Sequence, residues 1–257
     1  MPEIWENPFA NAILKIERAN KHIADIEQRL LASENTYNIS LGIHADTGEQ
    51  FLYYSLADKY IRASLALMIG DAIHNLHCAL DMAWREVVKR VSPAGFDASR
   101  SKFPVCKSRH ELESALVRTV KLDSTSALYR FMVDAVKSYK GGDSDIWAVH
   151  QLDIHDKHHL LIPVLNVLSI NGVELEHENG QVDCLTLALK GPIPGRIKTP
   201  IGSKLKNYGR ATFEVKFRDG IPGEGLEVVP ALRRFSAKIK EIVFRLRRHT
   251  SLSKMRA

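Results

Sequence analysis

The chain has 257 residues, an apolar content of 45% and a net charge of +6, which suit one large domain, or one domain with an appended subdomain, and exclude a largely disordered protein. Its first thirty residues mix charges of both signs without an apolar core of the secretory type. Its longest apolar stretch, residues 160–170, is shorter than the roughly 20 residues of a membrane span. The sequence therefore predicts a cytoplasmic protein with no membrane partner.

The first part of the chain is predicted to be helical, with one inserted β-hairpin. Apolar residues recur at helical spacing over residues 8–32, directly after an Asn-Pro helix start. Apolar and polar side chains alternate over residues 37–43, an Asp-Thr-Gly turn follows, and residues 51–54 resume an extended pattern, which together predict a hairpin. Residues 60–91 contain no helix breaker except Gly70, so a second long helix is expected there.

Three more helices and a strand-rich section are expected after residue 92. The helices cover residues 108–120, a segment capped by Ser124 that stops at Gly141-Gly142, and residues 145–161. The last of these is apolar on every side, which predicts a buried helix. Short strands are predicted over residues 164–170, 173–177 after an Asn171-Gly172 turn, 182–190 and 211–218, with a loop over residues 191–209.

Pro230 opens a final amphipathic helix that is basic on its outer side. The predicted fold class is therefore α+β: a mainly helical bundle with an N-terminal β-hairpin, a C-terminal strand-rich section and a terminal basic helix. Residues 1–163 would form the helical part and residues 164–257 the strand-rich part, and the two are expected to pack as one unit.

Charge divides the chain into two opposite parts. Residues 190–257 hold 17 Lys and Arg against 5 Asp and Glu, whereas residues 1–189 hold 19 against 25. This asymmetry indicates a face that binds RNA or DNA, or contact with an acidic protein partner or with the chain's own N-terminal part. A solvated basic surface is the simpler alternative. The residues predicted to bind phosphates are Lys204, Lys206, Arg210, Arg233, Arg234, Arg247 and Arg248.

Histidine and aspartate gather on two of the predicted helices. Four polar residues of the second long helix, Asp71, His74, His77 and Asp81, share one face, because they fall within an arc of about 120° at helical spacing. The helix over residues 145–161 supplies His150, Asp153, His155, Asp156, His158 and His159. Polar groups on a buried helix need partners, so these two helices are expected to pack against each other. The three scattered cysteines, Cys78, Cys106 and Cys184, are expected to be reduced core thiols.

These residues resemble a family of uncharacterised bacterial proteins. The shared segments begin at Gly70-Asp71 and His74-Asn75, continue through Ala79-Leu80-Asp81 and Phe103-Pro104-Val105, and end at Leu152-Asp153 and Asp156-Lys157-His158. The resemblance implies that His74, Asn75, Asp81, Asp156, Lys157 and His158 belong to the family pattern, and it brings no activity with it. His77 and His159 stand where the family usually has arginine. The helical part is also distantly similar to HEPN-type domains, many of which are RNases with an Arg-x(4–6)-His motif.

Three functions are compatible with these patterns. In the first, an RNA-cleaving protein uses His74 and His158 as general base and acid and Lys157 to stabilise phosphorane charge, while Asn75 and Asp81 complete the site. In the second, a divalent metal such as zinc binds His77, His155 and His159 with a carboxylate. In the third, the polar residues are the structural core of an interaction protein. The sequence assigns no oligomeric state.

Overall fold

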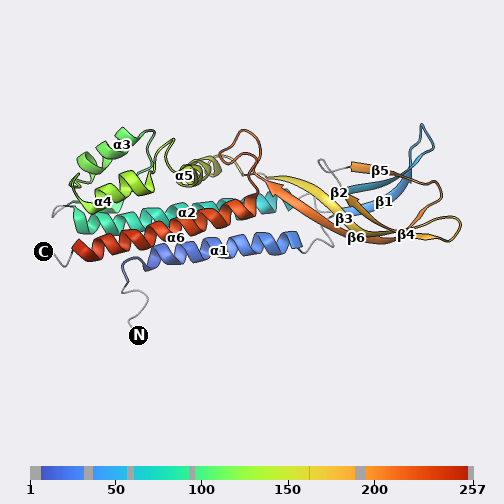
Figure 1. Cartoon of the computed structure of the whole chain (residues 1–257), viewed down its shortest axis with the longest axis horizontal. Coiled ribbons are helices and arrows are strands. Elements are labelled where there is room, and N and C mark those ends of the chain that lie inside the picture. Colours follow the sequence, from blue (N-terminus) through green and yellow to red (C-terminus); the bar gives the residue numbers. More distant parts are fainter. Residues whose placement is uncertain are drawn as a thin grey trace.

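The computed structural model describes residues 7–31, 37–56, 61–92, 96–161, 163–188 and 195–253. The molecule is elongated, with helices at one end and strands at the other (Figure 1). The α+β class predicted from the sequence is confirmed, including the early hairpin and the final helix. None of the described helices combines the length and apolar character that a membrane span requires.

Three long helices run side by side to form the helical body, and shorter helices cover one face of it (Figure 1). The long helices are α1 (Ala10–Leu31), α2 (Ile61–Val91) and α6 (Val228–Ser253). The shorter α-helices are α3 (Arg109–Ser114), α4 (Ala127–Arg130) and α5 (Ser144–Asp156). Segments α3 and α4 continue into π-helical turns over Ala115–Thr119 and Phe131–Val136. The apolar stripes of α1, α2 and α6 meet in one core, in which Trp84 and Phe235 are almost fully buried.

The strands form two three-stranded antiparallel sheets that face each other. One sheet has the order β1-β2-β5 and the other β4-β3-β6. The strands are β1 (Tyr37–Ile43), β2 (Gln50–Leu56), β3 (Val164–Glu176), β4 (Val182–Ala188), β5 (Gly195–Thr199) and β6 (Lys204–Lys216). Their inward side chains make a second core, which includes Leu52, Ile170 and Leu175. Phe213 packs against both cores and so joins the sheets to the helices.

The predictions for the strand-rich section were wrong at two places. Asn171 and Gly172 form no turn between two strands, because β3 runs through them, and Gly172 adopts a left-handed φ of +75° where the pairing with β4 shifts register. The predicted loop over residues 191–209 contains β5 and half of β6. These strands pair with β2 and β3, partners that local sequence patterns do not reveal.

Two helix predictions were also wrong in their details. The helix expected from Ser124 is capped instead by the Ser126 hydroxyl, and the helical segment ends at Val136 because Lys137 adopts a left-handed φ of 53°. Helix α5 ends at Asp156 rather than at residue 161. It is not buried on every side either, since Ile154 is 42% exposed.

Candidate active site between α2 and α5

Asp153 is the centre of a polar cluster between α2 and α5, which we call the α2–α5 seam: His74, His77, His150, Asp153 and Lys157. The Asp153 side chain is only 1% exposed. Its Oδ1 lies 2.8 Å from His74 Nδ1, and its Oδ2 lies 3.2 Å from His77 Nδ1 and accepts a bond from Lys157 Nζ at 2.5 Å. The expectation that these two helices pack against each other is therefore confirmed.

Two histidines extend the seam away from Asp153. An ionised carboxylate only accepts hydrogen bonds, so a proton on His77 Nδ1 suits its place 3.2 Å from Asp153 Oδ2. His77 Nε2 makes a hydrogen bond of 3.1 Å with His150 Nδ1. Burial lowers the pKa of His77 against the opposing pull of Asp153, and burial together with His77 lowers the pKa of His150. Burial thus favours the neutral form of both rings.

His74 is the exposed member of the seam. Its side chain is 49% exposed, and its Nε2 lies 3.4 Å from Cys78 Sγ, one helical turn further along α2. Because Nδ1 is held by Asp153, Nε2 is the nitrogen that is left to exchange a proton with a bound molecule. Burial raises the pKa of the Cys78 thiol although Lys15 opposes the shift, which favours the protonated thiol beside His74.

The two carboxyl groups near the end of α5 have opposite character. Burial would raise the pKa of Asp153, but the hydrogen bonds from Lys157 and His74 outweigh it and lower this pKa. Burial raises the pKa of Asp156, and the carboxylates of Asp153 and Asp71 add to the rise. Two carboxyl groups whose pKa values are pushed apart in this way are suited to separate roles as proton acceptor and proton donor.

Two predicted catalytic residues make contacts that support the fold. Asn75 is buried, donates to the Asp71 carbonyl at 2.7 Å and accepts a bond from Lys15 Nζ at 3.0 Å. Asp81 accepts the backbone N–H of Phe103 at 2.8 Å. These contacts tie α1 and the segment around Phe103 to α2. The sequence reasoning placed Asp153 and His150 on the right helix but did not select them as site residues, and it read Cys78 as a core thiol, whereas Cys78 is only half-buried and Cys184 is exposed.

The other histidines of the sequence-based site are spread along and beyond the end of α5. His158 and His159 are exposed on the turn that follows the helix, and the rings of His155 and His159 are 5.3 Å apart. His77 is bonded to Asp153 and His150 instead. Within the described ranges, no three His, Cys, Asp or Glu side chains converge as metal ligands, so the structure does not assemble the predicted set of His77, His155 and His159.

The predicted phosphate-binding residues do not form one surface. Lys204, Lys206 and Arg210 lie on β6 in the strand body, whereas Arg247 and Arg248 lie near the far end of α6 (Figure 1). Between these positions, Arg233 pairs with Glu27 of α1, and Arg234 pairs with Asp145 of α5. Lys238 also reaches Asp143 at 2.8 Å. Part of the basic C-terminal section is therefore neutralised by the chain's own acidic N-terminal part.

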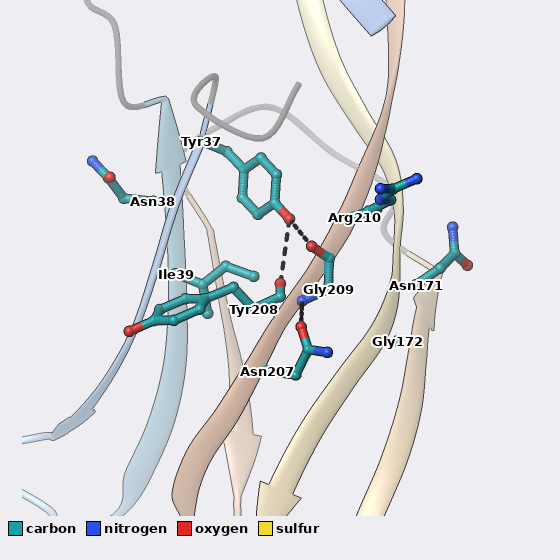
Figure 2. Close-up of a pocket in the computed structure, with 9 residues that line it drawn as sticks. All are labelled: Tyr37, Asn38, Ile39, Asn171, Gly172, Asn207, Tyr208, Gly209 and Arg210. Atoms are coloured by element: carbon teal, nitrogen blue, oxygen red, sulfur yellow. Dashed lines mark hydrogen bonds between the residues drawn. The ribbon is translucent and has the colours of Figure 1, made fainter. Parts of the chain in front are cut away.

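Arg210 also lines an open cavity of about 610 Å³ where β1 and β6 approach each other. Figure 2 shows the Tyr37 ring spanning this gap, and its hydroxyl donates to the Gly209 carbonyl at 2.6 Å. The Asn38, Asn171 and Arg210 side chains point away from Tyr37 in Figure 2 rather than toward one centre. The Tyr37 contact holds two edge strands together, and the polar groups around it do not converge on a ligand.

Comparison with protein-family models, with curated proteins and with solved structures found no match to this chain. The resemblance of the Gly70–Asp81 and Asp153–His158 segments to a bacterial family, and the distant similarity to HEPN-type domains, therefore stay predictions.

Proposed function

We propose that the α2–α5 seam is an acid–base site that cleaves phosphodiester bonds in RNA, with His74 as the general base. The observation that carries the proposal is the pairing of a buried carboxylate with a half-exposed imidazole: Asp153 Oδ1 lies 2.8 Å from His74 Nδ1. The carboxylate fixes the tautomer, which leaves the lone pair on Nε2, beside the Cys78 thiol. Imidazole side chains suit proton transfer at neutral pH.

The groups around His74 could supply the rest of this reaction. His74 would take the proton of the 2′-hydroxyl, whose oxygen attacks phosphorus and expels the 5′-oxygen as that oxygen gains a proton. The proton donor would be Asp156, whose pKa is raised by burial and by neighbouring carboxylates, or His158 on the following turn. The ammonium group of Lys157 belongs to the seam and that of Lys15 bonds to Asn75 on the same helix as His74. Both suit a substrate of negative charge.

A thiol-dependent acyl transferase is a second candidate, because Cys78, His74 and Asp153 follow the order of a nucleophile, base and orienting acid. Two observations favour the first proposal over it. Cys78 lies in the middle of α2, where backbone N–H groups are bonded within the helix and cannot form an oxyanion hole. Its pKa is also raised by burial, which disfavours the thiolate.

The test compares cleavage of a labelled single-stranded RNA with its all-deoxy counterpart. We expect the parent protein to cut only the RNA, because the attacking 2′-hydroxyl is absent from DNA. His74→Gln should lower the rate by about 100-fold or more, the usual contribution of a general base. Cys78→Ala and the exposed control His110→Gln should cut at the parent rate, with and without a chelator. A parent protein that leaves the RNA intact contradicts the proposal, and loss of cleavage in Cys78→Ala would favour a thiol mechanism.

A further inference from the structure

His155 and His159 form a histidine pair at the C-terminal end of α5. They are four positions apart, the spacing that places two side chains next to each other on one face of a helix. Helix α5 ends at Asp156, but the helical turn continues, because the backbone N–H groups of His158 and His159 donate to the His155 carbonyl at 3.1 and 2.8 Å. The backbone therefore holds the two histidines in place relative to each other before any ligand binds.

The separation of the two rings matches that of two imidazoles bound to one metal ion. The ring centres of His155 and His159 are 5.3 Å apart. An ion about 2.0–2.1 Å from one nitrogen of each ring lies about 3.2 Å from each ring centre, so tetrahedral coordination puts the two centres about 5.2 Å apart. Rotation about the Cβ–Cγ bond, which is broad for histidine, turns the nitrogens toward the ion and leaves the ring centres almost in place. A tetrahedral ion therefore fits between the rings without a change of the backbone.

Both rings of the pair are accessible and have no competing partner. His159 is exposed and His155 is partly exposed. Among the residues that the structure describes, neither ring has a partner for a hydrogen bond or an ion pair. The ammonium group of Lys157, which lies between them in sequence, is bonded to Asp153 in the α2–α5 seam. The partial negative charge at the C-terminal end of a helix also favours a bound cation.

We propose that His155 and His159 bind a divalent transition metal ion of the zinc class through one nitrogen of each ring. In the described part of the chain no third His, Cys, Asp or Glu side chain converges on the pair, so water completes the coordination and can be exchanged for another ligand. The site differs from the set predicted from the sequence, because His77 is bonded within the seam. It does not depend on the function proposed for the seam.

The experiment titrates the full-length protein with zinc chloride and follows the imidazole resonances of its histidines by NMR. We expect the resonances of His155 and His159 to shift together as a single ion binds. His155→Gln and His159→Gln should each weaken zinc binding at this site by at least about 100-fold, because the second bond of a chelate forms within one molecule. The matched control His158→Gln removes an exposed imidazole from the same turn and should bind zinc as the parent does. His74→Gln should also bind zinc normally, so the proposals for the pair and for the seam can fail separately.

Thermal unfolding of the same variants gives a second readout. A ligand that binds the folded state raises the melting temperature, so zinc at about 100 times its dissociation constant should stabilise the parent and His158→Gln. The same zinc concentration should have little effect on His155→Gln or His159→Gln. The proposal is overturned if zinc leaves the His155 and His159 resonances unmoved, if either of these two variants binds zinc as tightly as the parent, or if His158→Gln weakens binding as much as they do.

Discussion

Asp153 shows how a single carboxylate can organise a site. Its two oxygens contact two imidazoles and one ammonium group, and its side chain is almost completely enclosed. A buried charge of this kind is tolerated only when hydrogen bonds and opposite charges compensate its lost hydration. The same contacts that stabilise the ionised carboxylate also orient His74, so stability and reactivity are linked at this residue.

The neutral histidines of the seam predict a loss of stability in mild acid. The pKa values of His77 and His150 are lowered in the folded protein, chiefly by burial, so below the unfolded value of about 6.5 the unfolded chain binds more protons. The free energy of unfolding should therefore fall as pH drops from 7 toward 5. Asp153 affects stability in a separate pH range. Its pKa is lowered in the folded protein, so its contribution to the free energy of unfolding is lost only below about pH 4.

Urea unfolding between pH 5 and 8 measures this dependence. His150→Gln should show a shallower fall than the parent, and the exposed control His110→Gln should follow the parent. His249, whose pKa is also lowered by burial, is present in all three proteins and cancels in the comparison. An unchanged slope in His150→Gln would show that His150 is not held neutral by the seam.

At the scale of elements, the close approach of α2 and α5 depends on Gly70. A Cβ atom at this position would collide with the Asp156 carboxylate. Glycine within a helix is normally a weakness of about 1 kcal/mol relative to alanine, and α2 contains it in the middle of its apolar stretch. Gly70 thus leaves room on α2 for the Asp156 side chain of α5.

Gly70→Ala should therefore destabilise the protein instead of stabilising it. We expect a lower free energy of unfolding by about 1–3 kcal/mol, the common range for overpacking, and an altered environment of Asp156. Equilibrium denaturation of the variant gives the first quantity. Ala63→Gly, at an exposed position of the same helix, is the comparison for helix propensity alone. A Gly70→Ala protein that is more stable than the parent would mean that α5 moves away without cost.

At the scale of the whole molecule, charge joins sections that are distant in sequence. Arg234 and Lys238 of α6 pair with Asp145 and Asp143 at the start of α5. The Asp143 carboxylate also accepts the backbone N–H groups of Asp145 and Ile146. The opposite charges of the N- and C-terminal sections therefore meet in part within one chain, and these cations are not free to bind phosphates.

Two pairs of basic residues on α6, Arg234 with Lys238 and Arg247 with Arg248, should consequently differ in their effect on RNA binding. The helix is 26 residues long, about 39 Å at 1.5 Å per residue, so its two ends can be tested independently. Arg234→Gln with Lys238→Gln should lower stability by at most about 1 kcal/mol per exposed pair and leave RNA affinity unchanged. Arg247→Glu with Arg248→Glu should weaken RNA binding. The slope of the logarithm of the binding constant against the logarithm of the salt concentration should become shallower by about 0.7 for each lost phosphate contact. Equal effects of both variants on the salt slope would contradict this division.

The sequence by itself determined the elements whose signal is local. Helical periodicity predicted α1, α2 and α6, because each buries one apolar stripe. Alternation over residues 37–43, followed by the Asp46-Thr47-Gly48 turn, predicted the hairpin of β1 and β2. The sharing of one face by His74 and His77 also follows from helix geometry alone. The packing of α2 against α5 could be inferred as well, because polar groups on both helices needed partners.

Only the tertiary structure decided which polar groups meet and which strands pair. Asp153 became the centre of the seam, and His158 did not, because α5 ends at Asp156 and leaves His158 on an exposed turn. Strand β5 could not be predicted because its partner β2 lies more than 130 residues earlier, and local sequence patterns do not indicate such distant pairing. The separation of the basic residues could not be predicted for the same reason. The sequence gives their number, but their positions in space depend on how the chain returns along the helical bundle.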